Sequence, residues 1–156
     1  MLIEDGFTLP EPPERLWTTL LDVEKVATCV PGAELTETVD DRTWKGKVGL
    51  RFGAVSMTFV GTVAMTERDD ATHRVALEAK GVEQRGKGAA NATVTVWLEP
   101  SAEAEATSVR MRAEVSISGV AAQMSRGLIP EVSRKLTRQF AERLEATMID
   151  SPRPAS

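Results

Sequence analysis

Apolar residues recur at helical spacing towards the end of the chain. They occupy every fourth position from residue 128 onward: Leu128, Val132, Leu136, Phe140, Leu144 and Met148. The opposite face is charged and places Glu131 four residues before Lys135, and Arg138 four residues before Glu142, a spacing that favours ion pairs. The pattern predicts an amphipathic helix within residues 119–148, whose apolar face is covered by the rest of the chain.

A short alternating segment at the N-terminus predicts a first strand that ends at Pro10. A pair of prolines follows, which suits the first turn of a helix, and the apolar spacing predicts that this helix runs over Pro13–Leu21. Asp22 is then expected to cap a second short helix, which runs from Val23 to about Cys29 and stops before a Pro-Gly pair. Two short helices therefore separate the first strand from the second.

From residue 33 to residue 118, apolar and polar residues alternate in six further segments. Turns rich in glycine and polar residues separate them at positions 40–41, 53, 68–71, 81–88 and 99–107. One face of these segments is apolar, whereas the other carries Lys, Arg, Glu and Thr, as expected for strands with one solvent face. The whole pattern predicts an α+β fold, in which a strongly curved, seven-stranded antiparallel sheet wraps around the long C-terminal helix.

The length of 156 residues and the hydrophobic content of 42% fit one domain with an ordinary core. We expect this domain to cover residues 1–149, followed by a disordered tail at 150–156. The single cysteine, Cys29, excludes an intramolecular disulfide, and no secretory leader or membrane-spanning segment is apparent, so a cytoplasmic location is expected. The net charge of −4 argues against nucleic acid as a partner.

Side-chain size on the predicted inner face of the sheet suggests an internal cavity. Several inward positions are small or flexible: Gly46, Gly61, Ala79, Ala92 and Ala113, with Met57, Met65 and Met111 among them. Small residues leave volume in a sheet curled around a helix, and methionines line such volume adaptably. The alternative is that the glycines mark bends in the sheet and the methionines fill the core.

The helical signal weakens between residues 119 and 130. Gly127 lowers helix propensity, and Pro130 removes a helical hydrogen bond, so we expect the helix to kink here or to restart at Pro130. Val120, Met124, Leu128 and Ile129 would then form an apolar rim at the mouth of the cavity. An ordinary capping turn is the competing interpretation.

These arguments give a set of candidate ligand contacts in the cavity and at its mouth. The set is Met57, Phe59, Gly61, Met65, Leu77, Met111, Ala113, Val120, Met124, Leu128, Ile129, Val132 and Leu136. The loop at 81–88 resembles a phosphate-binding loop, but Gly88 stands where Ser or Thr is required and a strand follows, so we reject that function. Instead Arg85 and Lys87, together with Arg126, are candidate contacts to an acidic partner or to lipid headgroups, unless they are merely solvated.

No set of residues suited to catalysis or metal binding is apparent in the sequence. The only histidine, His73, falls in a predicted turn and is expected to be solvated, and Cys29 is expected to pack in the core. One histidine and one cysteine can hardly build a catalytic triad or a zinc site. We therefore expect no catalytic residues, no metal and no enzymatic activity.

The order of elements, with Trp17 in the first helix, resembles the helix-grip superfamily of START, polyketide-cyclase and pollen-allergen domains (SRPBCC). Four stretches are similar to the family of the carbon monoxide dehydrogenase G subunit (CoxG): Pro-Glu-Arg-Leu-Trp at 13–17 leading to Leu-Asp at 21–22, Cys-Val-Pro-Gly-Ala-Glu at 29–34, Phe-Val-Gly-Thr-Val at 59–63, and Ile-Ser-Gly at 117–119 running into 122–123 and 128–129. The stretch at 29–34 is the most specific of these. The resemblance extends over nearly the whole domain.

This resemblance implies an accessory protein of a molybdenum hydroxylase of the carbon monoxide dehydrogenase type, concerned with delivering the enzyme or its electrons to the membrane. We expect a non-enzymatic carrier that binds a long apolar ligand, with a quinone as the candidate, has no covalent cofactor and associates peripherally with the inner face of the cell membrane. One alternative is a protein-binding adaptor that recruits the hydroxylase to the membrane without a ligand. Another is a cyclase or hydrolase of the same superfamily, which would need inward-pointing polar side chains that the sequence almost lacks.

Overall fold

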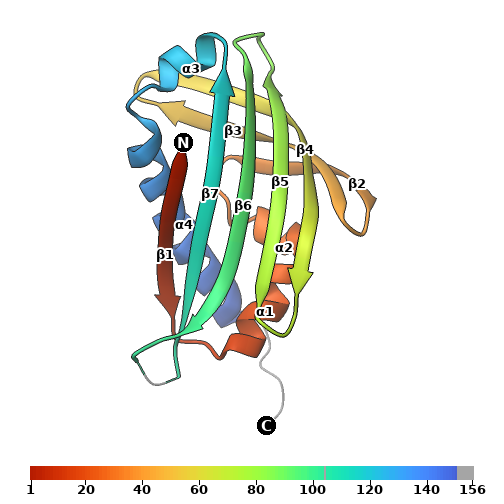
Figure 1. The fold of residues 1–156 in the computed structure, drawn as a ribbon, viewed down its shortest axis with the longest axis vertical. Coiled ribbons are helices and arrows are strands. Elements are labelled where there is room, and N and C mark those ends of the chain that lie inside the picture. The colour runs from red at the N-terminus through yellow and green to blue at the C-terminus, as the bar shows by residue number, and fades with distance from the viewer. Residues whose placement is uncertain (104, 151–156) are drawn as a thin grey trace.

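The computed structural model describes residues 1–103 and 105–150, which form one curved sheet with helices on its concave side (Figure 1). The elements are β1 Leu2–Leu9, α1 Pro13–Leu21, α2 Val23–Ala27, β2 Ala33–Asp40, β3 Thr43–Phe52, β4 Val55–Asp69, β5 Arg74–Glu83, β6 Ala89–Pro100, β7 Thr107–Ser118, α3 Val120–Ser125 and α4 Ile129–Asp150. The seven strands are antiparallel, in the order β1-β7-β6-β5-β4-β3-β2. The predicted α+β architecture is confirmed, whereas residues 151–156 of the predicted tail lie outside the described residues.

The two short helices begin where the sequence predicts. A proline occupies the first turn of α1, and the side chain of Asp22 accepts a hydrogen bond from the Lys25 backbone N–H at 3.2 Å to cap α2. α2 ends at Ala27, slightly earlier than predicted, because the following residues form tighter hydrogen bonds, such as Cys29 N–H to the Val26 carbonyl at 2.9 Å.

The predicted C-terminal helix is divided into α3 and α4. Gly127 between them has a φ of +79°, a left-handed conformation that ends a helix, and Pro130 is the second residue of α4. Its missing N–H is not needed in a first turn, so the predicted restart is confirmed. In the described part of the chain, no ion pair joins Glu131 to Lys135 or Arg138 to Glu142.

The apolar core forms two separate clusters. The α1 cluster, at one end of the molecule, is built from Leu9, Leu16, Trp17, Leu20, Cys29, Val75, Leu98, Val109, Leu144 and Met148. The α3 cluster, at the other end, is built from Phe52, Met57, Phe59 and Ala121, with residues of the α3–α4 turn and the start of α4 packed against it. Each cluster closes one end of the space between the sheet and α4.

A buried ion pair fastens α1 to the end of α4. Arg15 Nη1 donates to Glu11 Oε1 at 2.6 Å, and Arg15 Nη2 donates to the Met148 carbonyl oxygen at 2.7 Å. The Glu11 carbonyl in turn accepts a hydrogen bond from Thr107 Oγ1 at 2.8 Å. The first and last helices of the chain therefore meet over the α1 cluster.

α4 bridges the concave side of the sheet between β1 and β3. Its closest backbone approaches are to β1, at one edge, and to β3, near the opposite edge. The strands between them, β4 to β7, curve away beneath the helix (Figure 1). The region between α4 and these central strands must therefore be filled by side chains or by a bound molecule.

Candidate functional site

The antiparallel register arranges the inward-facing residues of the sheet in rows. Three such rows connect the two clusters, and we call them the middle band: Leu35, Gly46, Gly61, Gly81, Ala90 and Ile117; Trp44, Val63, Ala79, Ala92 and Val115; and Met65, Leu77, Val94, Ala113 and Ile3. The outer rows touch the clusters, because Ala90 and Ile117 pack against the α3 cluster and Met65 packs against the α1 cluster. Most members of the first two rows are small. The first row therefore offers little side-chain volume, whereas the second contains the large and buried Trp44.

Several apolar side chains in this region remain partly accessible although they point inward. Leu77 on β5, Met111 on β7 and Leu136 on α4 are half-buried and belong to neither cluster. A close-packed interior would bury them as completely as it buries Val75, which is 4% exposed on the same face of β5. Because Leu77 lies on a central strand, its accessibility comes from the concave side, which indicates incompletely filled space beneath α4.

Two glycines of the middle band contribute to the curvature of the sheet and leave no free volume at their own positions. A Cβ atom on Gly61 would lie 1.8 Å from the Lys80 carbonyl oxygen, and one on Gly46 would lie 2.6 Å from the Glu34 carbonyl oxygen. For these two glycines the alternative interpretation applies, in which glycine marks a bend in the sheet. The backbone of the neighbouring strand occupies the place that a side chain would need. Small residues that face the interior without such a close approach are Gly81, where an added Cβ atom would come no nearer than 3.4 Å to its neighbours, and alanines such as Ala79 and Ala92, which oppose each other on β5 and β6.

The predicted ligand contacts fall into three groups. Leu77, Met111, Ala113 and Leu136 lie at or beside the middle band, together with Gly61. Met57 and Phe59 are buried in the α3 cluster, and Met65 packs against the α1 cluster. Met124, Leu128, Ile129 and Val132 are half-buried and pack onto the α3 cluster, whereas Val120 is 50% exposed on the outside of α3.

Two acidic side chains share the inner face: Asp5 on β1, and Glu83 at the end of β5, opposite Phe59 of the α3 cluster. Asp5 on β1 opposes Met111 on β7, two residues before Phe7, whose ring packs on Phe140 at a centroid distance of 5.9 Å. Its Oδ1 accepts a hydrogen bond from the Gly6 backbone N–H at 2.8 Å. In the sequence, Asp5 alternates in step with Ile3, Phe7 and Leu9, so its position on the inner face could have been predicted.

Sequence reasoning missed Glu83, a buried carboxylate at the end of β5. Glu83 is 3% exposed, and its two oxygens accept hydrogen bonds from the backbone N–H groups of Thr58 and Arg85, each at 2.9 Å. The bond from Thr58 is the main reason that the pKa of Glu83 lies below its usual 4.5. The turn that it organises supports α3, because the Lys87 carbonyl accepts a hydrogen bond from Ala121 N–H at 2.6 Å.

The only histidine and its neighbours form a structural cluster rather than a proton-transfer site. His73 lies in the β4–β5 turn, as predicted, but it is half-buried, with its ring 5.3 Å from that of Trp17. Trp17 Nε1 donates to Asp70 Oδ1 at 2.9 Å, and the Arg68 guanidinium, more than this bond, lowers the pKa of Asp70. In the described ranges, no three potential metal ligands come together.

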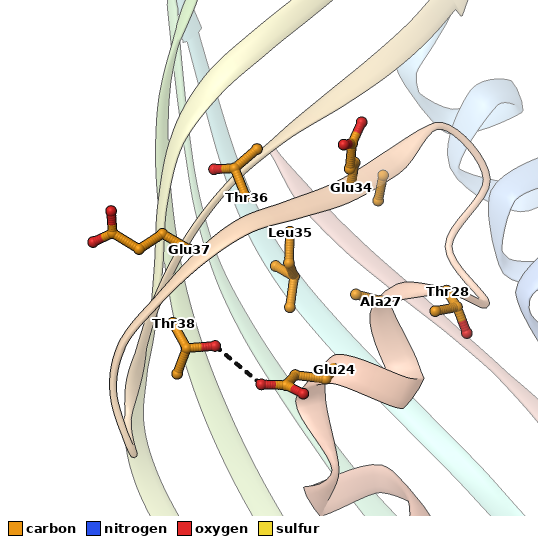
Figure 2. A pocket seen from close by; sticks show the side chains of 9 residues that line it. Glu24, Ala27, Thr28, Glu34, Leu35, Thr36, Glu37 and Thr38 are labelled. Carbon is orange, nitrogen blue, oxygen red and sulfur yellow. Dashed lines mark hydrogen bonds between the residues drawn. The ribbon is translucent and has the colours of Figure 1, made fainter.

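A groove lies between α2 and β2, on the side of β2 to which the inward-facing Leu35 points (Figure 2). It has a volume of about 460 Å³ and is lined by Glu24, Ala27, Thr28, Ala33, Glu34, Leu35, Thr36, Glu37 and Thr38. Thr38 Oγ1 donates to Glu24 Oε1 at 3.0 Å across it. A second hollow, of about 670 Å³, lies between the prolines before α1 and the loop that follows β6.

The model of one protein family matches residues 6–149, nearly all of the described chain. It describes the G subunit of carbon monoxide dehydrogenase (CoxG). The chain belongs to the CoxG family. This confirms the resemblance carried by the four stretches named above, and membership suggests an accessory role in association with a carbon monoxide dehydrogenase complex.

Solved structures similar to this CoxG-family protein share its helix-grip fold. A conserved protein from Geobacillus kaustophilus is 19% identical, with a TM-score of 0.83 and 97% of each chain covered. A protein from Thermus thermophilus is 14% identical, with a TM-score of 0.66 and 96% and 97% covered. The Zhui aromatase/cyclase from a Streptomyces species is 12% identical, with a TM-score of 0.57 and 96% and 91% covered. At these identities the likeness concerns the fold alone.

No curated protein matches this CoxG-family chain. The family is that of an accessory subunit, which suggests that the chain is not itself an enzyme. None of the helices in residues 1–103 and 105–150 combines the length and apolar character needed to cross a bilayer.

Proposed function

We propose that this CoxG-family protein is a non-enzymatic carrier that holds a long apolar ligand between α4 and the middle band of the sheet. The observation that supports this most strongly is the contrast along β5, where Val75 is buried and Leu77, two residues further on the same face, remains accessible. Two packed clusters close the ends of the interior, and a partly open, apolar region lies between them. Such a shape suits an elongated molecule that has to be shielded from water.

A quinone is the ligand that best fits the family. A molybdenum hydroxylase releases electrons to an acceptor. If that acceptor is lipid-soluble, it can leave the bilayer only when it is bound in an apolar site of a protein. Contact with Leu77, Met111 and Leu136 would stabilise a prenyl chain by about 25 cal/mol per Å² removed from water. The redox chemistry would belong to the quinone, and the protein would need no covalent cofactor.

The same proposal includes a peripheral link between the hydroxylase and the membrane. A carrier of this kind must collect its ligand at the surface of a bilayer and then meet the enzyme. We therefore expect it at the inner face of the cell membrane, bound reversibly and not as an integral protein.

Extraction of purified protein followed by mass spectrometry tests the ligand. The protein is prepared without detergent, as wild type and as Ala92→Phe, which places a ring in the middle band. We expect an apolar molecule, with a quinone as the leading candidate, in wild type and at least a tenfold lower amount in Ala92→Phe. Ala54→Phe, at an exposed turn position, is the matched control and should retain the wild-type amount. A dry interior that yields no apolar molecule would contradict the proposal.

A docking adaptor without a ligand is the second candidate, and an observation favours it: one end of the molecule gathers cations that form no salt bridge in the described part of the chain. Both candidates must bind the hydroxylase, so binding does not separate them. Electron delivery does, because Ala92→Phe should abolish it in a carrier while leaving the affinity for the hydroxylase unchanged. An adaptor would retain both.

A further inference from the structure

Three neighbouring turns form one surface at the α3 end of the molecule (Figure 1). The β3–β4 turn meets the α3–α4 turn, since a Cβ atom on Gly53 would lie 3.9 Å from Leu128 Cδ1. The β5–β6 turn is bound to α3 through the hydrogen bond from Ala121 N–H to the Lys87 carbonyl. We call this surface the cationic end, because it carries Arg51, Arg85, Lys87 and Arg126.

The charge of the cationic end is opposite to that of the whole protein. The chain has a net charge of −4, yet residues 51–57, 83–88 and 119–130 contain one acid, Glu83. That carboxylate is buried and bound to backbone N–H groups, so it is not presented at the surface. Most turns at the opposite end are rich in acids, including Asp69, Asp70, Glu103 and Glu105.

None of the four cations of this surface forms a salt bridge within the described residues, although the charge of the half-buried Lys87 helps to lower the pKa of Glu83. The ion pairs there involve other cations, such as Lys47 with Glu34 at 3.6 Å and Arg74 with Glu67 at 3.7 Å. Arg51 donates to the Gly53 carbonyl, at 3.3 Å, and not to a carboxylate. The positive potential of the cationic end therefore extends into solvent, where it can steer an oppositely charged partner.

We propose that the cationic end docks onto an acidic patch of a partner protein. Surfaces that bind membranes peripherally insert Trp, Phe or Leu side chains, whereas the exposed large apolar residues near this end are valines: Val60, its register partner Val82, and Val120. Three of the four cations are arginines, whose planar guanidinium groups bind carboxylates through two parallel hydrogen bonds. The remaining exposed positions are largely Gly, Ala, Ser and Gln, which suit a flat contact with another protein.

The proposal relies on the proposed function only for the choice of partner, the carbon monoxide dehydrogenase of the family. Docking by this end would bring the α3 cluster against the enzyme and leave the acidic end facing solvent. Association driven by charge is faster and tighter at low ionic strength, so the affinity should fall as salt is added.

Charge reversal tests this surface. Arg85→Glu with Arg126→Glu changes the net charge by −4, and the matched control, Arg138→Glu with Arg143→Glu on the exposed side of α4, changes it equally. The dissociation constant for the purified dehydrogenase complex is measured at low salt for both variants and for wild type. We expect at least tenfold weaker binding for Arg85→Glu/Arg126→Glu and a change of less than about threefold for the control. Equal weakening, or no binding by wild type, overturns the proposal.

A second arm separates protein from lipid. Wild type and both variants are sedimented with vesicles of phosphatidylcholine containing phosphatidylglycerol. Vesicle binding that Arg85→Glu/Arg126→Glu abolishes, with dehydrogenase affinity unchanged, would assign the surface to lipid and overturn the proposal. The amount of extractable apolar ligand should be the same in these variants, so a missing ligand would count against the carrier function and not against the docking surface.

Discussion

The α1 cluster and the middle band are built by the same strands but are packed differently. Val75 and Leu77 point to the same side of β5, yet Val75 is buried whereas Leu77 is not. The difference lies in what covers them, because α1 and the C-terminal part of α4 supply large side chains over the α1 cluster. Over the middle band, α4 approaches β1 and β3 and leaves Leu77, on the central strand β5, partly accessible. Packing in this fold is thus set by the helices, and the strands alone do not determine it.

The largest expected effect comes from truncating one leucine of α4 in each region. Leu144 is 0% exposed in the α1 cluster, and Leu136 is half-buried above the middle band, two turns earlier. We expect Leu144→Ala to lower the free energy of unfolding by about 2–5 kcal/mol and Leu136→Ala by less than about 2 kcal/mol. Urea denaturation of the two variants checks this. Equal losses would mean that the middle band is packed as tightly as the cluster.

The reverse change, from a small to a large side chain, should give the next largest difference. Ala121→Leu overfills the α3 cluster, where Ala121 is fully buried, and should cost about 1–3 kcal/mol. Ala92→Leu extends into the partly open middle band and should cost less than about 1 kcal/mol. Thermal unfolding of the ligand-free proteins measures both. If Ala92→Leu lowers the stability as much as Ala121→Leu does, the middle band is packed as tightly as the α3 cluster.

Glu83 tests how the α3 end is held together. Its pKa is lowered in the folded state, so the stability that it contributes is present above its unfolded value of about 4.5 and is lost as the pH falls through the folded value. Glu83→Gln should therefore be less stable than wild type at pH 7, and this difference should shrink as the pH falls below the reference value of 4.5 and through the lowered pKa of the folded state. It should also speed hydrogen exchange at the Thr58 and Arg85 amides. A difference in unfolding midpoint that is constant with pH would rule out the carboxylate as the cause.

The smallest effect is expected at the turn between α3 and α4. A Cβ atom on Gly127 would meet no atom within 4 Å, so Gly127→Ala tests backbone conformation alone. Its φ of +79° should make the substitution cost about 1–2 kcal/mol. Ala122→Gly, within α3, provides a helical reference for the loss of a methyl group. An unchanged or raised melting temperature in Gly127→Ala would show that this turn relaxes freely.

Much of the fold could be predicted because its strands are joined by hairpins and each turn has its own sequence signal. The restart of the last helix followed from Gly127 and Pro130, which act through backbone geometry alone. The early end of α2 at Ala27 could not be predicted, because the residues up to Cys29 continue in tighter turns that have no distinct sequence pattern.

The candidate site was harder to predict, because alternation identifies the inner face but not which rows are covered. Leu77 and Met57 look equivalent in the sequence, yet one lies in the middle band and the other is fully buried. The function of Gly61 depends on how closely Lys80 approaches it, which only the strand register reveals. Glu83 looked like part of a solvated loop, because the donor that matters most to it, the Thr58 N–H, belongs to β4 and is brought near it by folding.

The bridging position of α4 has a consequence for how the protein is made. The helix consists of the 22 residues Ile129–Asp150 and is the last element to be synthesised. Until it leaves the ribosome, the concave side of the sheet has nothing to cover it, and Arg15 cannot reach the carbonyl of Met148. Stable folding must therefore wait until α4 has left the ribosome, and a chain that stalls before α4 is complete would expose an apolar sheet prone to aggregation.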